Sequence, residues 1–183
     1  MAIKNKRPPR KETVGAQYIC FATPGEDDEW SGQYEADVER TATVKSVSVT
    51  ENSESTDVYA SGEVYDTDQA AAADSIEVEV IAFPIDTLAK ARAATVDDGG
   101  LIKDGAPKTR PFFAYGKVVL MKNGHFRYEW YPKCKLTENS DETATREESP
   151  SEQNDTFTIS AYSFDAEGNK KTYVDSTAAN FPE

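Results

Sequence analysis

RPFFAYGKVVLMKNGHFRYEWYPKCK, residues 110–135, is the stretch that decides the fold. Two aromatic-rich, β-prone runs flank Lys122-Asn123-Gly124, and Asn-Gly supplies the positive backbone angles that a tight turn needs. The pattern predicts one long β-hairpin over residues 111–135. Neither this hairpin nor the rest of the sequence contains a catalytic constellation, which indicates a protein that works by shape and self-association.

The segment 75–83 shows the strict alternation of a half-buried strand. The apolar residues of this segment are Ile76, Val78 and Val80, and they alternate with the acidic residues Glu77 and Glu79. One face of this strand is therefore expected to be buried, and the other to be acidic and wet. Pro84 stops the strand and lies near the start of a predicted helix over residues 85–95, which the sequence 97–100 (DDGG) ends.

Shorter β-prone segments complete the expected architecture. Strands are predicted at 17–23, 40–50, 58–62, 157–164 and 171–174. The alternation in the second of these slips once between Val44 and Val47, which predicts a bulge. Residues 67–74 suit one helical turn or a short loop. The sum is a mainly β fold, a β-sandwich or open barrel with one flanking α-helix.

A length of 183 residues fits one domain with a real core. We expect a basic, flexible N-terminal arm at 1–14, a single β-sandwich domain with long polar loops at 15–176, and a C-terminal tail at 177–183. The polar loops fall at 24–37 and within the acidic tract 137–156.

The net charge of −13 is unevenly distributed. The arm holds five basic residues, Lys4, Lys6, Arg7, Arg10 and Lys11, which leaves 15 basic side chains (20 less these five) against 33 acidic ones. Two interpretations of the arm stay open: a frayed, solvated terminus, or a segment that docks on an acidic neighbouring subunit. The acidic body argues against high-affinity DNA binding, because it repels phosphate.

The residues that usually carry chemistry are sparse. His125 is the only histidine and has no nucleophile motif beside it, and the acidic runs 26–29 and 97–100 lack the spacing of a calcium loop. Cys20 and Cys134 are expected to be buried, reduced thiols, and whether they lie close together is left open. No catalytic, cofactor or metal site is predicted.

No stretch approaches the roughly 18 apolar residues of a membrane helix, and no secretory signal is evident, so we expect a cytoplasmic origin without membrane binding.

Three stretches together resemble the major tail proteins, or tail tube proteins, of long-tailed bacteriophages, in particular the group found in phages of Gram-positive hosts. They are the polar segment 50–62 (TENSESTDVYASG), the strand-to-helix segment 76–94, and the aromatic hairpin 110–135. They span roughly residues 40–165. The basic arm and the acidic tract 137–156 depart from the family pattern.

The resemblance implies a β-sandwich with a helix that assembles into hexameric rings, which stack into a hollow tube for DNA ejection. It implies no catalytic residue and no cofactor. It implies a place in the virion tail after assembly in the host cytoplasm, with a tape-measure protein, a tail terminator and distal tail or baseplate proteins as partners. An acidic lumen would let DNA pass without sticking. Glu77 and Glu79 are the candidate lumen-facing acids, because they share the strand face opposite the core set.

Other non-enzymatic functions remain open from the sequence. They are a tail terminator, a capsid decoration protein, and a carbohydrate-binding or adhesion β-sandwich. Copy number and polymerisation into tubes distinguish the first two from a tail tube protein, and secretion and glycan binding would mark the third.

Overall fold

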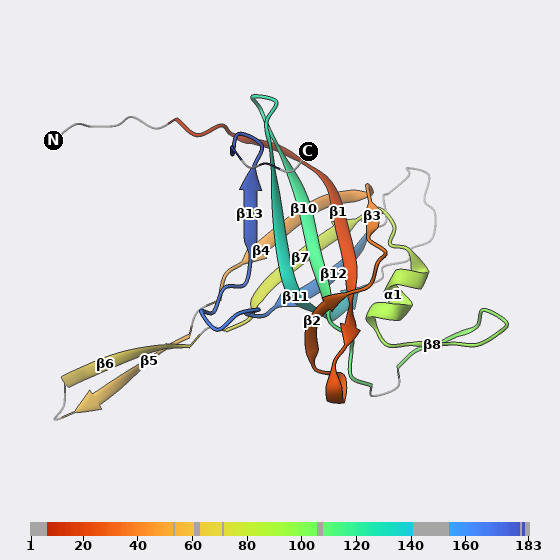
Figure 1. Cartoon of the computed structure of the whole chain (residues 1–183), viewed down its shortest axis with the longest axis horizontal. Coiled ribbons are helices and arrows are strands. Elements are labelled where there is room, and N and C mark those ends of the chain that lie inside the picture. Colours follow the sequence, from red (N-terminus) through yellow and green to blue (C-terminus); the bar gives the residue numbers. More distant parts are fainter. Residues whose placement is uncertain are drawn as a thin grey trace, which may run out of the picture.

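The computed structural model shows an antiparallel β structure with one helix (Figure 1). It describes residues 7–52, 54–60, 63–70, 72–105, 108–140, 154–179 and 181, and for 54–60 and 63–70 only the backbone. The strands are β1 (Lys11–Pro24), β2 (Trp30–Tyr34), β3 (Glu39–Thr41), β4 (Val44–Thr50), β5 (Glu54–Ala60), β6 (Glu63–Ala70), β7 (Asp74–Val80), β8 (Thr95–Val96), β9 (Ile102–Lys103), β10 (Phe113–Met121), β11 (Phe126–Ser140), β12 (Asp155–Ala161) and β13 (Thr172–Asp175). The helix α1 covers Ile85–Ala91, and a 3-10 turn covers Glu26–Asp28. The predicted mainly β fold with one helix is confirmed.

Nine strands form one sheet in the order β2-β1-β10-β11-β12-β7-β4, with β3 added to β1 and β13 added to β11. The sheet folds over on itself, so that β4, β7 and β12 cross behind β1, β10 and β11 (Figure 1). The core lies between these two layers, as in a β-sandwich. Two small hairpins, β5–β6 and β8–β9, stand outside the main sheet.

The predicted aromatic hairpin is confirmed as β10 and β11. Gly124 has a φ of 80°, which a residue with a side chain rarely adopts. The Met121 amide donates to the His125 carbonyl at 2.8 Å, and the Gly124 amide donates to the Met121 carbonyl at 3.0 Å. The second strand runs on to Ser140, beyond the predicted end, because residues 134–140 find a further partner in β12.

Strand β11 joins the two layers. Its first part pairs with β10 on one edge and with β13 on the other, and its last part pairs with β12. An irregularity in the pairing places Tyr131 opposite Tyr115 but Cys134 opposite Phe113. The extra residue in β11 keeps both of these inner side chains on the core face and bends the strand toward the second layer.

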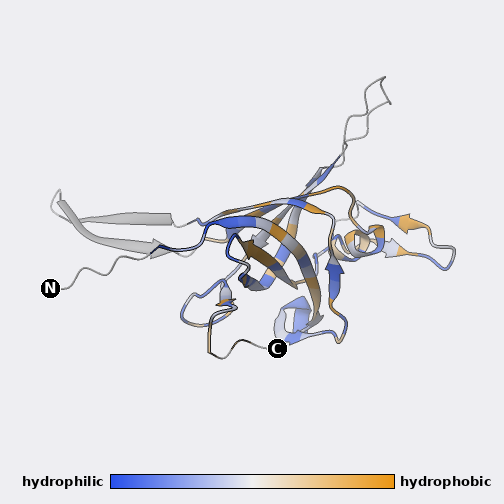
Figure 2. Cartoon of the chain, turned by 90° about the horizontal axis from the view of Figure 1, so that it is seen from above, coloured by the Kyte–Doolittle hydropathy of each residue, from blue (hydrophilic) through white to orange (hydrophobic). Residues whose placement is uncertain are grey.

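The core is built from the inner faces of both layers. Its fully or almost fully buried members come from five strands and the helix: Ile19, Phe21, Ile76, Val78, Val80, Ala91, Phe113, Tyr115, Tyr131, Cys134, Leu136, Phe157, Ile159 and Ala161. The hydropathy colouring of Figure 2 shows the hydrophobic residues concentrated on the strands of the body and on α1. The predicted inward set of β7 is therefore confirmed.

Several local predictions meet a definite outcome. The predicted bulge near Val44 is confirmed by a register shift between Val44 and Ser46. Both cysteines are buried free thiols, as expected. The helical turn or loop expected at 67–74 is wrong, because β6 continues to Ala70 and β7 begins at Asp74. Strand β1 begins at Lys11, inside the segment assigned to the arm, since its first residues pair with the end of β10.

The helix is shorter than the predicted 85–95. It ends at Ala91, and Ala93 takes a positive φ of 58°. The Ala93 and Ala94 amides then donate to the carbonyls of Lys90 and Ala89, at 3.0 and 2.8 Å. This closing turn satisfies the last helical carbonyls and redirects the chain into β8, six residues before the glycine pair at 99–100.

Gly116 on β10 yields a first prediction. A Cβ at this position would lie 2.1 Å from the Trp130 ring, whereas a Cβ at Gly15 on β1 would have its nearest neighbour at 3.7 Å. Gly116→Ala should therefore lower the free energy of unfolding by about 1–3 kcal/mol through overpacking. Gly15→Ala should leave it equal or slightly higher. Urea denaturation of the two variants measures the difference, and equal effects would contradict the close approach of Trp130.

The alkaline stability of the fold yields a second prediction. Burial raises the pKa of the Cys134 thiol above its ordinary 9.0 and the pKa values of Tyr115 and Tyr131 above 10.0. A group whose pKa is higher in the folded chain stabilises it fully below the unfolded-state pKa and loses this contribution as pH rises. The free energy of unfolding should therefore start to fall near pH 9, by up to about 1.4 kcal/mol per pH unit for each titrating group.

Replacing the thiol tests this assignment. In Cys134→Ala the fall between pH 9 and 10 should be shallower, since the Cys20 thiol, whose pKa burial also raises above 9.0, and the tyrosines then remain. Urea denaturation at closely spaced pH values from 8 to 11 measures the slope. An unchanged slope in the variant would assign the effect to groups other than Cys134.

Candidate functional site

The outward side of β4, β7, β12 and the last part of β11 forms a continuous polar surface, here called the polar face. Its members are hydroxyl and carboxylate side chains: Ser46, Ser48, Ser75, Glu77, Glu79, Glu138, Ser140, Thr156, Thr158 and Ser160. Strand register sets them in rows, and one row runs from Ser48 through Glu77 and Thr158 to Glu138. The core therefore lies on one side of this sheet, and an acidic, hydroxyl-rich surface lies on the other.

The two candidate acids occupy different environments on this face. Glu77 is exposed, and no partner within the described residues is recorded for it. Glu79 is half-buried: it accepts hydrogen bonds from Asn154 Nδ2 at 2.8 Å and Ser46 Oγ at 3.2 Å, and Lys45 Nζ lies 3.8 Å away. Glu77 thus presents its carboxylate to solvent, while Lys45 lies close enough to Glu79 to offset part of its charge.

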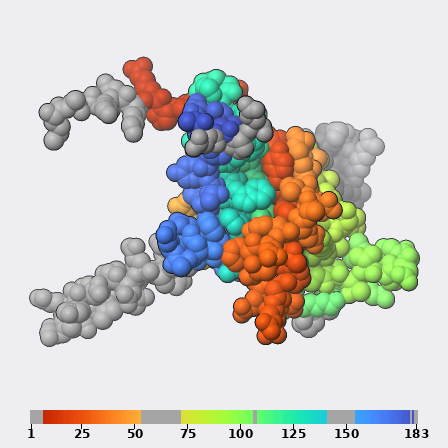
Figure 3. All heavy atoms as spheres, in the orientation of Figure 1, coloured from red at the N-terminus to blue at the C-terminus, as the bar shows by residue number. Residues whose placement is uncertain are grey.

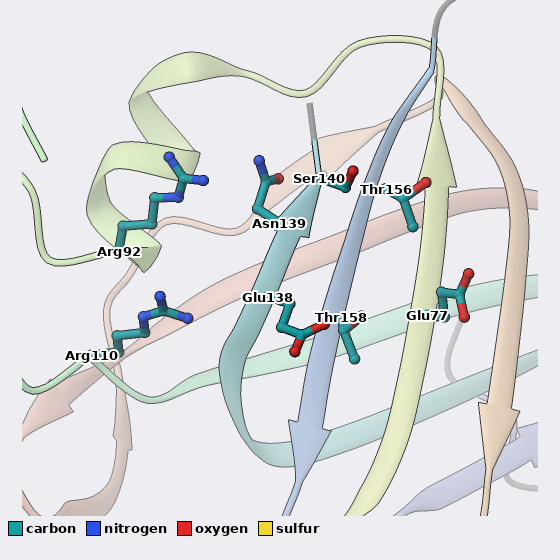
Figure 4. A pocket seen from close by; sticks show the side chains of 8 residues that line it. All are labelled: Glu77, Arg92, Arg110, Glu138, Asn139, Ser140, Thr156 and Thr158. Atoms are coloured by element: carbon teal, nitrogen blue, oxygen red, sulfur yellow. The ribbon is translucent and has the colours of Figure 1, made fainter. Parts of the chain in front are cut away.

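A hollow of about 550 Å³ opens at the helix side of the polar face (Figure 4). Figure 4 shows Glu77, Thr158 and Glu138 on three adjacent strands, with Arg92 and Arg110 on the opposite wall. Both arginines are already engaged. Arg110 Nη1 donates to the carbonyls of Leu136 and Thr137 at 2.9 and 2.6 Å, and Arg92 pairs with Asp104 at 2.7 Å. Arg92 thus ties the end of α1 to the chain just after β9, and Arg110 ties the segment before β10 to β11.

The opposite end of the polar face is basic and aromatic. Lys135, which pairs with Ser160 in register, lies over the Phe112 ring at 3.9 Å. Lys133 lies over the rings of Phe112 and Trp30, at 5.5 and 5.2 Å. Neither lysine has a carboxylate partner within 4 Å among the described residues. The face therefore changes from acidic to basic along the strand direction.

A buried polar row lies inside the sheet, on its concave side. Gln17, Lys117 and Glu129 are neighbours across β1, β10 and β11, and Lys117 Nζ lies 3.2 Å from Glu129 Oε2. Burial lowers the pKa of Lys117, and the carboxylate of Glu129 opposes this shift. Neither polar atom of the Gln17 side chain has a hydrogen-bond partner in the described structure. This row keeps one end of the core polar.

The base of the β5–β6 hairpin is clamped by ion pairs. Lys170 Nζ donates to Asp74 Oδ1 at 2.6 Å and to the Asn52 carbonyl at 3.2 Å, and Asp74 also accepts from the Asn52 amide at 3.2 Å. Lys171 pairs with Glu51, which lowers the pKa of that carboxyl group. The hairpin projects away from the body at this point (Figure 1). The lysines tie the β12–β13 loop to the root of the hairpin.

None of the clusters described above has the arrangement of a catalytic or metal-binding site. Within the described ranges, no three His, Cys, Asp or Glu side chains are grouped so as to hold a metal ion. His125 lies beside the hairpin turn, where its Nδ1 is 3.3 Å from Ser176 Oγ. No helix in the described part of the chain is long and apolar enough to cross a membrane.

The comparison with protein families decides the identity. A family model described as phage tail tube protein matches residues 18–182. The chain belongs to the phage tail tube protein family. It is thus a structural protein of the virion tail that assembles with further copies of itself, as the resemblance implied. No curated protein matches the sequence.

Two hairpins of this tail tube protein were not predicted from the sequence. The β5–β6 hairpin went unrecognised because residues 67–74, which include the end of its second strand, were interpreted as one helical turn or a short loop, although Ser61-Gly62 separates two β-prone runs. The β8–β9 hairpin surrounds the same Asp-Asp-Gly-Gly sequence that was taken as the end of a helix. In both cases the turn residues carried the signal.

The clamp at the hairpin root yields a third prediction. The side chains of Lys170 and Asp74 are only 14% and 5% exposed, whereas that of Glu51 is 65% exposed. Lys170→Ala should lower the free energy of unfolding by about 3 kcal/mol, because it leaves a buried carboxylate unpaired. Lys171→Ala should cost less than about 1 kcal/mol. Thermal or urea unfolding of these adjacent variants measures both, and equal losses would contradict the clamp.

Proposed function

We propose that this tail tube protein forms hexameric rings that stack into the tube, and that its polar face lines the lumen through which DNA is ejected. The observation that carries the proposal is the chemistry of that face. Apart from its basic end at Lys133 and Lys135, it consists of hydroxyl groups and carboxylates over four strands, with the core behind it. Such a surface stays hydrated and repels phosphate, so DNA slides along it without binding.

The sheet also offers an edge for ring closure. Strand β4 is the last strand in the order, so its outer edge has no strand partner in the described structure. Backbone groups on such an edge pair readily with another chain. Joining β4 to a neighbouring copy would continue the polar face around a ring, and a contact between unlike edges closes into a ring by rotation.

A place in the tail tube implies contacts with other tail proteins. A tape-measure protein in the lumen, a terminator at one end of the tube and distal tail or baseplate proteins at the other would meet stacked rings of this chain, after assembly in the host cytoplasm. The family match favours the tube over the terminator, decoration and carbohydrate-binding alternatives. Negative-stain microscopy of the purified protein tests the proposal: rings or hollow tubes support it, and a monomer at every concentration contradicts it.

The lumen assignment of Glu77 and Glu79 yields a fourth prediction. Glu77→Lys should slow DNA ejection several-fold or retain DNA in the tail, because every ring repeats the new positive charge. Glu79→Gln should have a smaller effect, since Lys45 already offsets part of its charge and Asn154 holds the carboxylate by a hydrogen bond. Ejection kinetics of phages carrying each variant measure this.

A control separates lumen charge from total charge. Glu167 lies exposed in the β12–β13 loop, away from the polar face, so Glu167→Lys changes the net charge equally without changing that face. Ejection as fast in Glu77→Lys as in this control would contradict the lumen assignment. A cryo-microscopy map of the tube with Glu77 on its outer wall would do the same.

A further inference from the structure

The hairpin β8–β9 carries exposed apolar side chains on either side of its turn and is here called the finger (residues 95–103). Val96 and Leu101 are 57% and 60% exposed. Asp97 Oδ1 accepts the amides of Gly99 and Leu101 at 3.2 and 3.0 Å, which fixes the turn. Figure 1 shows the finger projecting from the body beside α1, and Figure 2 shows hydrophobic residues on it. An ordered finger with aliphatic residues in water is suited to insertion into another surface.

A matching hollow lies on the outward side of the other layer and is here called the aromatic groove. It has a volume of about 400 Å³ and is lined by Tyr18, Tyr128, Trp130 and Val174 from β1, β11 and β13, together with the ion-paired Lys117 and Glu129. The Trp130 ring lies on Gly116 and fills the space that a side chain there would take. Figure 3 shows β11 exposed on this side of the molecule between β13 and β1.

Charge complements shape at these two places. Arg40 on β3 is the register neighbour of Tyr18 at the rim of the groove, and it is exposed. Asp98 stands exposed at the tip of the finger. No ion pair within 4 Å is recorded for either side chain in the described part of the chain. Arg40 at the rim therefore has an acidic counterpart, Asp98, on the finger.

The finger and the groove of one chain point to different sides. The finger extends outward beyond α1, while the groove spreads from β1 across β11 to β13 on the other side (Figures 1 and 3). The occupant of the groove is then the finger of a second copy. A contact between two different patches is heterologous, so each copy both gives a finger and receives one, which is the geometry of a ring.

We propose that Val96 and Leu101 of one copy insert into the aromatic groove of the next copy, with Asp98 placed against Arg40. This inference rests on the proposed ring and adds a lateral contact to the one proposed at the β4 edge. Burying an aliphatic side chain of this size strengthens association about tenfold or more. The opposite charges would set the register of the contact.

The test uses one finger variant and one groove variant of the full chain, Leu101→Glu and Val174→Glu. Each alone should need at least about a tenfold higher concentration to associate, measured by analytical ultracentrifugation. Mixed together, they should form one-to-one pairs. The intact finger of Val174→Glu binds the intact groove of Leu101→Glu, and the altered finger and altered groove that remain free cannot bind a third copy. Tyr173→Glu is the matched control: Tyr173 is 66% exposed on the same strand but lies on its opposite face, so association should be unchanged.

A charge swap tests the proposed register and does not touch the apolar side chains. Arg40→Asp and Asp98→Arg should each weaken association, and the double variant should recover most of the loss. If the wild type forms rings or tubes and both Leu101→Glu and Val174→Glu do so at the same concentration, the inference is overturned and the proposed function stands. If the wild type stays monomeric throughout, both are overturned.

Discussion

The pairing of one long strand with both layers is the constraint on which the rest of this tail tube protein depends. Strand β11 lies between β10 and β13 at its start and beside β12 at its end. The irregularity between Tyr131 and Cys134 lets it bend without turning its core side chains outward. Because one strand serves two layers, the sheet encloses a core on its concave side and leaves two outward faces with different chemistry.

The two outward faces differ in chemistry and suit different contacts. The face of β4, β7, β12 and the end of β11 consists of hydroxyl groups and carboxylates, whereas the face of β1, β10 and the start of β11 consists of aromatic and aliphatic groups. In a tube, the first suits contact with water and passing phosphate, and the second suits contact with protein. The buried row of Gln17, Lys117 and Glu129 shows that the molecule keeps polar groups inside at a cost in stability.

The predictability of the fold follows from the range of the interactions. The Asn-Gly turn, the alternation from Ile76 to Val80 and the slip near Val44 were recognised because each depends on neighbours a few residues apart. The length of the helix was not, since it is decided by the closing turn at Ala93. The polar run from Thr137 to Ser140 is a strand only because β12 lies beside it.

The sequence by itself determined the β class, the long hairpin and the opposition of Glu77 and Glu79 to a buried set, since these rest on local periodicity and turn chemistry. It also carried the resemblance to tail tube proteins, through three stretches similar to that family. Only the tertiary structure decided which strands share a face and what meets Glu79. It joined Lys170 to Asp74 across 96 residues and brought Tyr18, Trp130 and Val174 around one hollow. The physical reason is that register between distant strands is set by the packing of the whole core, which no short stretch of residues contains.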